Sequence, residues 1–430
     1  MKRENLAPGV FLNTLDAQKF NRCRITIRFQ YPACRETATA SAVLPLVLER
    51  CCADYPDMTL LSRRLAKLYG ADLSVDNSTN GANRVLTVSV TGIKDEFALE
   101  GEDLTAEYAD LVFGVAFRPY LVNGRFDEEA LAIERGKLRQ QLQAEVNDKR
   151  LYCVRQARRR FFGDSLAGVE RDGYLEEVDG VTPQLLTQVY EEMLCRASIE
   201  VTAIGAKDET VRRLLLAALE GRKRDWQAPL PGVFMPRRQP DHQVETMDMV
   251  QAKLCLLFTA GRCTGAQEIA ASRLAMALYG GSVTSRLFLN VREKQSLCYY
   301  CFAVPEAQKG LMVVTAGIQR ENAERTKEEI LRQWKEVCRG EFTDGALEDA
   351  RRALINAYRE LTDNPSGLES WYTARAMAGI TRSPEDEIAM VAALTRDDVI
   401  ASANKLTPDT FYLMEGTAEH DEEEEPDHAD

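Results

Sequence analysis

Histidine is the residue that this sequence most nearly lacks. The 430 residues include only three, His242, His420 and His428, and the last two lie in an acidic stretch at the C-terminal end. A zinc hydrolase of the His-Glu-x-x-His type needs two imidazoles one helical turn apart on one helix face. No two histidines in the sequence have that spacing. We therefore expect neither a zinc site of this kind nor the catalytic residues that would accompany it.

Long apolar segments are also missing. No stretch offers the roughly 18 uninterrupted apolar residues of a membrane-spanning helix, and residues 1–13 lack the apolar core of a secretory signal. An excess of acidic residues gives a formal net charge of −13, which argues against a general binder of nucleic acid or of anionic membranes. The sequence therefore predicts a cytoplasmic protein that binds neither nucleic acid nor membrane.

Motifs of other enzyme classes are absent or weak. The sequence contains no G-x-x-x-x-G-K-[ST] phosphate loop and no G-x-S-x-G nucleophile elbow. Ser402 and Lys405 fit the pattern S-x-x-K, but a four-residue pattern with two free positions arises readily by chance. Cysteine catalysis usually needs a histidine base, and only His242 lies outside the acidic end. An enzyme of unrelated chemistry is thus the least favoured hypothesis.

Cysteine is present in an odd number. The eleven cysteines are scattered along the chain, which suits reduced thiols better than a disulfide framework. Cys298 and Cys301 form the one C-x-x-C motif, in a stretch with the pattern of a strand. Residues three apart in a strand point to opposite faces, and no second pair completes a four-cysteine zinc site. We therefore expect no disulfide, no metal and no cofactor.

The two halves of the chain repeat the same order of expected elements. In each half a strand leads to two helices, a two-strand run, further helices including a long one (127–160 in the first half), a Thr-capped helix and a terminal strand. The capping residues Thr182 and Thr395 correspond to each other. At a constant offset, the first half matches the second in the pairs Phe126 and Phe342, Ala130 and Ala346, Leu131 and Leu347, Arg135 and Arg351, and Leu138 and Leu354. Such a register indicates internal duplication.

The duplication predicts an α+β fold of two tandem homologous domains, each with an antiparallel or mixed sheet and helices on one side. The basic, proline-rich stretch 221–243 breaks any regular element and is expected to be a linker. The domains are then expected at 1–220 and 244–416. Residues 417–430 are acidic and contain too few apolar residues to fold, so we expect a disordered tail.

The stretch 279–300, YGGSVTSRLFLNVREKQSLCYY, combines several local signals. A short amphipathic helix, expected over 284–293, follows Gly280 and Gly281 and precedes a strand. Arg292 lies near the end of this helix, and Tyr299 follows seven residues later at the start of the strand. Both side chains could project into one cavity, which suits gripping a peptide carbonyl or a developing oxyanion. The alternative is an exposed arginine beside a half-buried strand tyrosine.

A duplicated chain with SRLFLNVREKQSLCYY in its second half resembles the insulinase/pitrilysin zinc-peptidase superfamily, especially the two-domain subunits similar to mitochondrial processing peptidase. The resemblance covers nearly the whole chain up to the acidic end and implies an insulinase-like half-clamshell. In active members the first domain carries the inverted zinc motif His-x-x-Glu-His and a further Glu ligand. The second domain contributes an Arg and a Tyr, seven residues apart, that contact the substrate. Arg292 and Tyr299 occupy the positions of that pair.

The first domain departs from the family's pattern. The helix that would hold the zinc motif, 41–50, contains no histidine and a single acid, Glu49. In the helix that should supply the further ligand, the residues 134–137 resemble the family's Glu-Arg-Glu-Lys and place Gln143 near the ligand position, with Glu145 the nearest acid. A neutral amide is a poor zinc ligand, and a lone carboxylate cannot assemble a site. The resemblance therefore implies no metal ligand and no catalytic residue.

The zinc ligands are missing, while Arg292 and Tyr299 are retained. The resemblance therefore implies a catalytically inactive member, similar to the YfmF-like bacterial branch. Such a chain would not be an enzyme on its own. It would be the substrate-binding or regulatory subunit of a heterodimer, and a zinc-bearing homologue would act on the extended peptide. Related pairs are associated with modification of elongation factor P or with peptide processing. The alternative is a purely structural scaffold that binds no peptide.

Overall fold

The computed structural model describes residues 1–15, 18–235, 239–261, 263, 265–377, 380 and 382–416. The chain divides into two compact units, each built from separate segments of the sequence. Unit 1 comprises Met1–Ala144, Val169–Pro231 and Glu360–Ser383, and unit 2 comprises Glu145–Gly168, Gly232–Arg359 and Pro384–Asp430. The sequence predicts contiguous domains, 1–220 and 244–416, whereas each compact unit also takes one segment from the other half of the chain.

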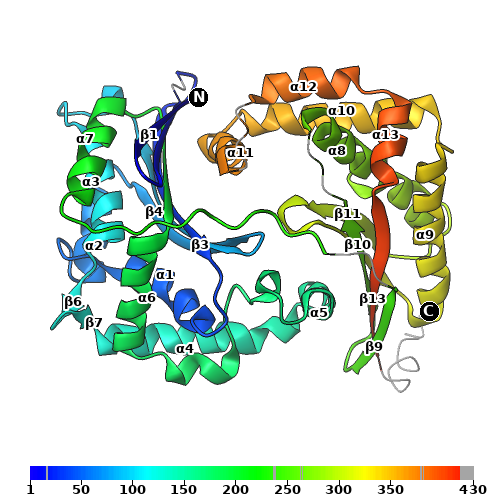
Figure 1. Ribbon diagram of the computed structural model, residues 1–430, viewed down its shortest axis with the longest axis horizontal. Helices are drawn as coiled ribbons and strands as arrows, with labels where there is room; N and C mark the ends of the chain where they lie inside the picture. The colour runs from blue at the N-terminus through cyan, green and yellow to red at the C-terminus, as the bar shows by residue number, and fades with distance from the viewer. Residues whose placement is uncertain are drawn as a thin grey trace, which may run out of the picture. The chain divides into compact units, whose positions relative to one another are not determined.

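Unit 1 contains a six-stranded sheet in the order β1-β2-β8-β3-β5-β4. Figure 1 labels three of its strands, β1, β3 and β4. The strands are β1 (Lys2–Ala7), β2 (Val10–Leu15), β3 (Arg22–Pro32), β4 (Asp72–Asn80), β5 (Asn83–Ile93) and β8 (Ser198–Ile204). All neighbours are antiparallel except β2 and β8, which are parallel. Alternate residues of β3 are apolar, and Ile25, Ile27 and Phe29 among them are fully buried.

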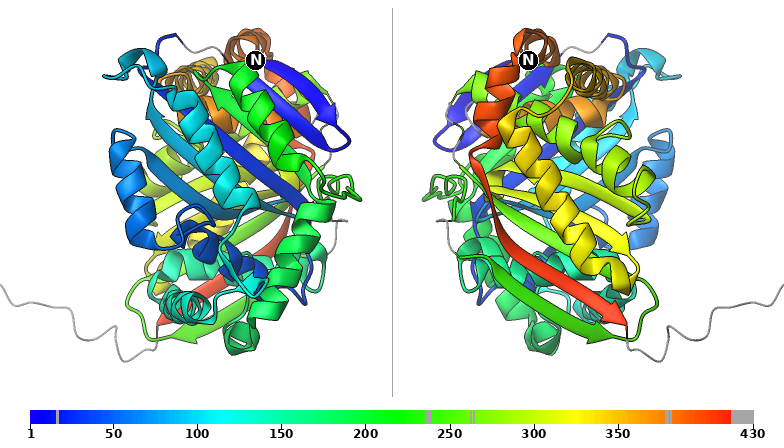
Figure 2. Two further views of the ribbon diagram at one scale, coloured as in Figure 1. Left: turned by 90° about the vertical axis from the view of Figure 1, so that its left-hand side faces the viewer. Right: turned by 90° about the vertical axis from the view of Figure 1, so that its right-hand side faces the viewer.

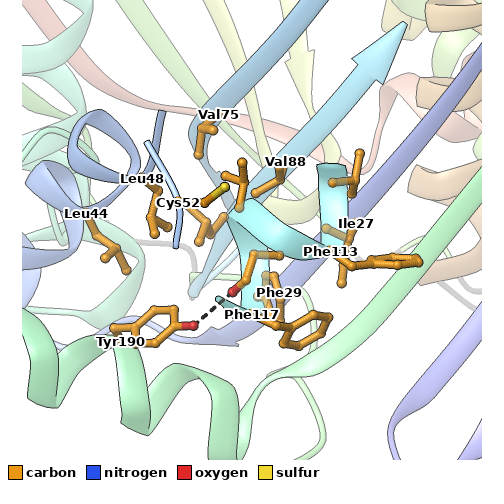
Figure 3. Close-up of a cluster of buried hydrophobic side chains, with 14 of the residues drawn as sticks. Ile27, Phe29, Leu44, Leu48, Cys52, Val75, Val88, Phe113, Phe117 and Tyr190 are labelled. Atoms are coloured by element: carbon orange, nitrogen blue, oxygen red, sulfur yellow. Dashed lines mark hydrogen bonds between the residues drawn. The ribbon is translucent and has the colours of Figure 1, made fainter. Parts of the chain in front are cut away.

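Helices cover one face of this sheet. They are α1 (Ala38–Arg50), α2 (Met58–Lys67), α3 (Leu104–Phe117), α4 (Glu128–Ala144), α6 (Pro183–Arg196) and α7 (Asp208–Leu219), with a small hairpin of β6 (Leu121–Val122) and β7 (Arg125–Phe126). Packing α1, α3 and α6 against β3 to β5 forms the apolar core shown in Figure 3. The hydroxyl of Tyr190 in α6 donates to the carbonyl of Ala116 in α3 at 3.1 Å, so the one polar atom of that ring is satisfied.

Unit 2 contains a five-stranded sheet in the order β11-β12-β10-β13-β9. The strands are β9 (Asp241–Met247), β10 (Ala252–Ala260), β11 (Tyr300–Glu306), β12 (Leu311–Ile318) and β13 (Leu406–Gly416). The helices are α5 (Lys149–Phe162), α8 (Ala266–Gly280), α9 (Ala323–Arg339), α10 (Asp344–Leu361), α12 (Pro384–Ala393), α13 (Arg396–Ala403) and a π-helix, Leu287–Glu293. Figure 2 shows α9, in yellow, over one face of the sheet.

The two sheets confirm the duplication. The order β2-β8-β3-β5-β4 of unit 1 is repeated as β9-β13-β10-β12-β11 in unit 2, with the parallel pair at the same place. Equivalent side chains also make equivalent bonds. Arg135 donates to the carbonyl of Val181 at 2.9 Å, and Arg351 donates to the carbonyl of Leu394 at 2.9 Å. Each acceptor directly precedes the capping threonine of the next helix, which the sequence identifies correctly.

The second face of each sheet is covered by a helix from the other half of the sequence. In unit 2, α5 packs on β10 and β13, and in unit 1, α11 (Pro365–Met377) packs on β3 and β8. The sequence predicts helices on one side only, so this layer is an addition to the expected fold. The contact in unit 1 is polar, because Glu369 of α11 forms ion pairs with Arg24 and Arg28 on the polar side of β3.

Within the stretch predicted to be a linker, 221–243, residues 221–235 are irregular, and Asp241 begins β9, which pairs in parallel with β13. The sequence DHQVETM has few apolar residues because β9 is an edge strand, with alternate residues exposed. Residues 236–238 of the linker and the expected tail, 417–430, lie outside the described residues.

Candidate functional site

Arg292 lies on the π-helix that follows α8. The expected helix at this place is confirmed, but its hydrogen bonds are wider than those of an α-helix: the amide of Lys294 donates to the carbonyl of Leu289, five residues back, at 3.0 Å. Leu287 and Val291 are fully buried and attach this helix to the core of unit 2. A π-helix has a wider turn than an α-helix and often occurs at functional sites. It gives Arg292 an orientation that the 3.6-residue period of an α-helix does not predict.

Arg292 and Tyr299 line one pocket in unit 2. Its volume is about 410 Å³, and its lining is completed by Glu293, Ser296, Leu297, Cys298 and Gln319. Tyr299 is 49 % exposed, and the side chain of Arg292 is 42 % exposed. The amide of Tyr299 donates to the carbonyl of Gly317 in β12 at 2.8 Å, which fixes its backbone beside the sheet. The structure thus brings the two predicted residues together, while their role towards a substrate stays a prediction.

The pocket combines one cation with a phenol. The guanidinium of Arg292 lies over the ring of Phe288, 4.9 Å from its centroid, and its Nε is 3.5 Å from Oε1 of Glu293. The stacking on Phe288 restricts the arginine to one side of the π-helix. A guanidinium is a donor only, and a phenol can donate as well. The pair is therefore suited to carbonyl or carboxylate oxygens.

The turn between the two residues holds a strained backbone. Ser296 has a φ of 51°, in the left-handed region that favours glycine. Its amide donates to the carbonyl of Arg292, and the amide of Leu297 donates to the carbonyl of Val291. These bonds close the end of the π-helix, and they bring the chain back towards Tyr299. No local sequence signal predicts this conformation for a serine.

Cys298 is a pocket residue that the sequence analysis does not select. The prediction that Cys298 and Cys301 point to opposite faces is wrong, because the strand begins at Tyr300 and Cys298 lies in the irregular segment before it. The neighbouring thiol of Cys301 lowers the pKa of the Cys298 thiol, burial opposes the change, and the positive charge of Arg292 lowers that pKa further.

The helix corresponding to the zinc-motif position is α1, and it is apolar. Leu44, Val47 and Leu48 are buried in the core of unit 1. Glu49 accepts a hydrogen bond from the amide of Val75 at 3.3 Å, and the buried Glu134 pairs with Arg50 at 2.7 Å and with Lys137 at 2.8 Å. These carboxylates therefore have structural partners.

The second candidate ligand region is equally unsuited to a metal. Gln143 is exposed at the end of α4, and Glu145 forms an ion pair with Arg155 in unit 2. Across the described residues, no group of three or more His, Cys, Asp or Glu side chains could hold a metal ion. In the same part of the chain, no helix is both long enough and apolar enough to cross a membrane.

A family model described as the peptidase M16 inactive domain matches residues 180–354. This match runs from the end of the first half of the sequence to α10 and includes Arg292 and Tyr299. The M16 class is the insulinase/pitrilysin class of peptidases, so the match agrees with the resemblance drawn from the sequence.

A relative over nearly the whole length is the "Probable inactive metalloprotease YmfF" of Bacillus subtilis, 25 % identical over 410 residues, which are 95 % of this chain and 96 % of that protein. The branch expected from the sequence is therefore confirmed, under the name YmfF rather than YfmF. An uncharacterized zinc protease of Streptomyces coelicolor is 26 % identical over 297 residues, or 66 % of this chain and 64 % of that protein.

Solved structures share the fold. A conserved protein from Enterococcus faecalis superposes with a TM-score of 0.87 at 24 % identity, covering 97 % of this chain and 98 % of that one. A peptidase M16 inactive domain from Pseudomonas fluorescens superposes with a TM-score of 0.76 at 16 % identity, covering 97 % and 98 %. At these identities the likeness supports the fold alone, and it confirms the predicted α+β class.

Proposed function

We propose that this chain, an inactive homologue of M16 peptidases, binds an extended peptide as the non-catalytic subunit of a heterodimer. The partner would be a zinc-bearing homologue, which would supply the metal and cleave the peptide. The pocket of Arg292 and Tyr299 would hold part of that peptide. We place the complex in the cytoplasm, since eleven scattered cysteines suit a reducing compartment.

The observation that carries this proposal is that Arg292 and Tyr299 line one pocket. Both side chains are about half exposed, so a ligand can reach them without a rearrangement of the core. Donors of this kind bind the carbonyl groups of any peptide and require no particular side chain. Affinity through main-chain groups gives little sequence selectivity, which suits a subunit that presents substrate to another.

The need for a partner follows from α1. A zinc hydrolase requires several imidazole or carboxylate ligands around one ion. At the place that the family uses for them, this chain has Leu44, Val47 and Leu48 in an apolar core, with Glu49 and Glu134 bonded to neighbours. Cleavage by the family's chemistry would therefore have to come from a second chain.

Peptide binding is expected to weaken about tenfold or more in Arg292→Ala and about two- to tenfold in Tyr299→Phe. A hydrogen bond to a charged group contributes about 1.5–3 kcal/mol and one between neutral groups about 0.5–1.5 kcal/mol, and about 1.4 kcal/mol corresponds to a factor of ten. The measurement is fluorescence anisotropy with a fluorescein-labelled random-sequence peptide pool. It is made on this protein alone and in a one-to-one mixture with a zinc-bearing homologue from the same genome, after zinc is removed to prevent cleavage.

The matched control is Arg325→Ala, which removes an exposed arginine from α9 and changes the net charge by the same amount. It should leave the affinity unchanged, because it does not line the pocket. If no peptide binds either sample more tightly than about 1 mM, or about 4 kcal/mol, the protein is a structural scaffold and the proposal fails. Equal binding by all variants would instead place the peptide elsewhere.

A further inference from the structure

The two cysteines of the pocket differ in exposure. Cys298 is partly exposed and lines the pocket with Arg292, whereas Cys301 is 4 % exposed in β11. Their thiols nevertheless influence each other, and Cys298 lies just before the strand that contains Cys301. Solvent can therefore reach the sulfur of Cys298, whereas the sulfur of Cys301 is buried.

Their chemical states differ in the same sense. The interaction between the two thiols lowers the pKa of Cys298 and raises the pKa of Cys301 well above the ordinary value of a thiol, and burial raises the pKa of Cys301 further. The charge of Arg292 also favours a thiolate at Cys298. A thiolate is the nucleophile in exchange with disulfides, and its proportion at neutral pH rises as the pKa of the thiol falls towards that pH. Cys298 thus has the features of an attacking thiol and Cys301 those of a resolving thiol.

We propose that Cys298 and Cys301 form a thiol–disulfide exchange site in the Arg292 pocket, and that its substrate is a low-molecular-weight disulfide bearing carboxylates. The pocket of about 410 Å³ is of a size that holds small molecules. The half-exposed guanidinium of Arg292 offers a partner for a carboxylate of such a molecule. This site does not depend on peptide binding, and it can exist whether or not the chain has a zinc-bearing partner.

The exchange proceeds in two balanced steps. The thiolate of Cys298 attacks one sulfur of the substrate disulfide, a mixed disulfide forms at Cys298, and the other half leaves as a thiolate that takes up a proton. The thiol of Cys301 then loses its proton and attacks Sγ of Cys298. A disulfide between Cys298 and Cys301 forms, and the second half leaves as a thiol. The protein loses two electrons and two protons, and the substrate is reduced to two thiols.

The test uses oxidised glutathione and the full chain. After incubation, quenching with acid and alkylation, trypsin releases both cysteines on one peptide, 295–309, which contains no other cysteine. In the wild type this peptide should lose two hydrogen atoms. In Cys301→Ser the same peptide should instead carry one glutathione, because the resolving thiol is gone. In Cys298→Ser neither change should occur.

Two further measurements make the result specific. Cys34 is an exposed cysteine in unit 1, so Cys34→Ser is the matched control and should leave the oxidation of 295–309 unchanged. In the Cys301→Ser background, Arg292→Gln should slow the reaction of Cys298 severalfold, because the cation that favours the thiolate is removed. In the wild type, iodoacetamide should also alkylate Cys298 faster than Cys51 and Cys338, which are buried to a similar degree.

The proposal is overturned if Cys298 of the wild type is alkylated no faster than Cys51 and Cys338. It is also overturned if the wild-type peptide keeps a stable mixed disulfide, since Cys301 would then not resolve it. Because the alkylation rate is measured on the unaltered protein, a folding defect in either serine variant leaves the proposal testable. Loss of peptide binding in Arg292→Ala has no bearing on these outcomes, so the two proposals fail independently.

Discussion

Glu369→Gln is expected to lower the free energy of unfolding of unit 1 by about 3–5 kcal/mol, the usual loss when one partner of a buried ion pair is removed. Glu369 is 1 % exposed and pairs with Arg24 and Arg28, whose side chains are 16 % and 14 % exposed. The amide of glutamine keeps the shape but leaves two partly buried cations without their anion. The helix α11 that carries Glu369 should therefore detach from β3 at a lower concentration of urea.

The measurement is urea unfolding followed by tryptophan fluorescence, because Trp371 is buried in α11, close to Glu369 in sequence. The matched control is Glu360→Gln, an exposed glutamate at the end of α10 in the same segment of the chain. That change should shift the free energy by about 0.5 kcal/mol or less. Equal losses in the two variants would mean that the ion pairs do not hold α11 on unit 1.

Gly280→Ala is expected to destabilise the protein by about 1–3 kcal/mol, although alanine is the better helix former. A Cβ at this position would lie 2.7 Å from Cδ1 of Leu287 and 2.8 Å from Cβ of Ala303. These atoms belong to the π-helix, which carries Arg292, and to β11, which Tyr299 directly precedes, so the new methyl group would push these two elements apart. Peptide binding, where present, should weaken together with stability.

The matched control for this change is Gly136→Ala in α4. A Cβ there meets no heavy atom within 4 Å. Removing the backbone freedom of a helical glycine should then stabilise the protein by about 0.5–1 kcal/mol. The two substitutions are chemically identical, and the account predicts opposite signs in thermal denaturation. A stabilising Gly280→Ala would show that the end of α8 is not tightly packed.

Much of the fold follows from local patterns. The capping threonines Thr182 and Thr395 each identify the start of a helix correctly. The match between Phe126 to Leu138 and Phe342 to Leu354 reveals a repeat that the strand orders confirm. These features are readable because each depends on a few neighbouring residues whose burial or backbone bonds set their type.

Local patterns in the sequence do not show which sheet each helix packs against. Periodicity predicts one helix over 127–160, whereas Asp148 caps a new helix by accepting a bond from the amide of Leu151 at 3.0 Å. The second piece, α5, then packs on the sheet of unit 2. A pattern shows which side of a helix is buried, but not which sheet buries it. The exchange of α5 and α11 between the halves therefore needs the structure.

Part of the candidate site can also be predicted from local sequence patterns. The spacing of Arg292 and Tyr299 suggests a shared cavity, and they do line one pocket. The contact between Cys298 and Cys301 is missed because it depends on where the strand starts. A strand that included Cys298 would place the two residues on opposite faces, whereas the observed strand starts at Tyr300. Boundaries of elements are the least certain feature of any reading from sequence.

The central claim, a non-catalytic M16 subunit that serves a zinc-bearing partner, is tested most directly by zinc content and peptide cleavage measured together. Both are determined on this protein alone, on a zinc-motif homologue from the same genome alone, and on their one-to-one mixture. We predict that this protein holds no zinc and cleaves no peptide, and that the mixture cleaves faster than the homologue alone. Stoichiometric zinc together with unaided cleavage by this chain would contradict the account.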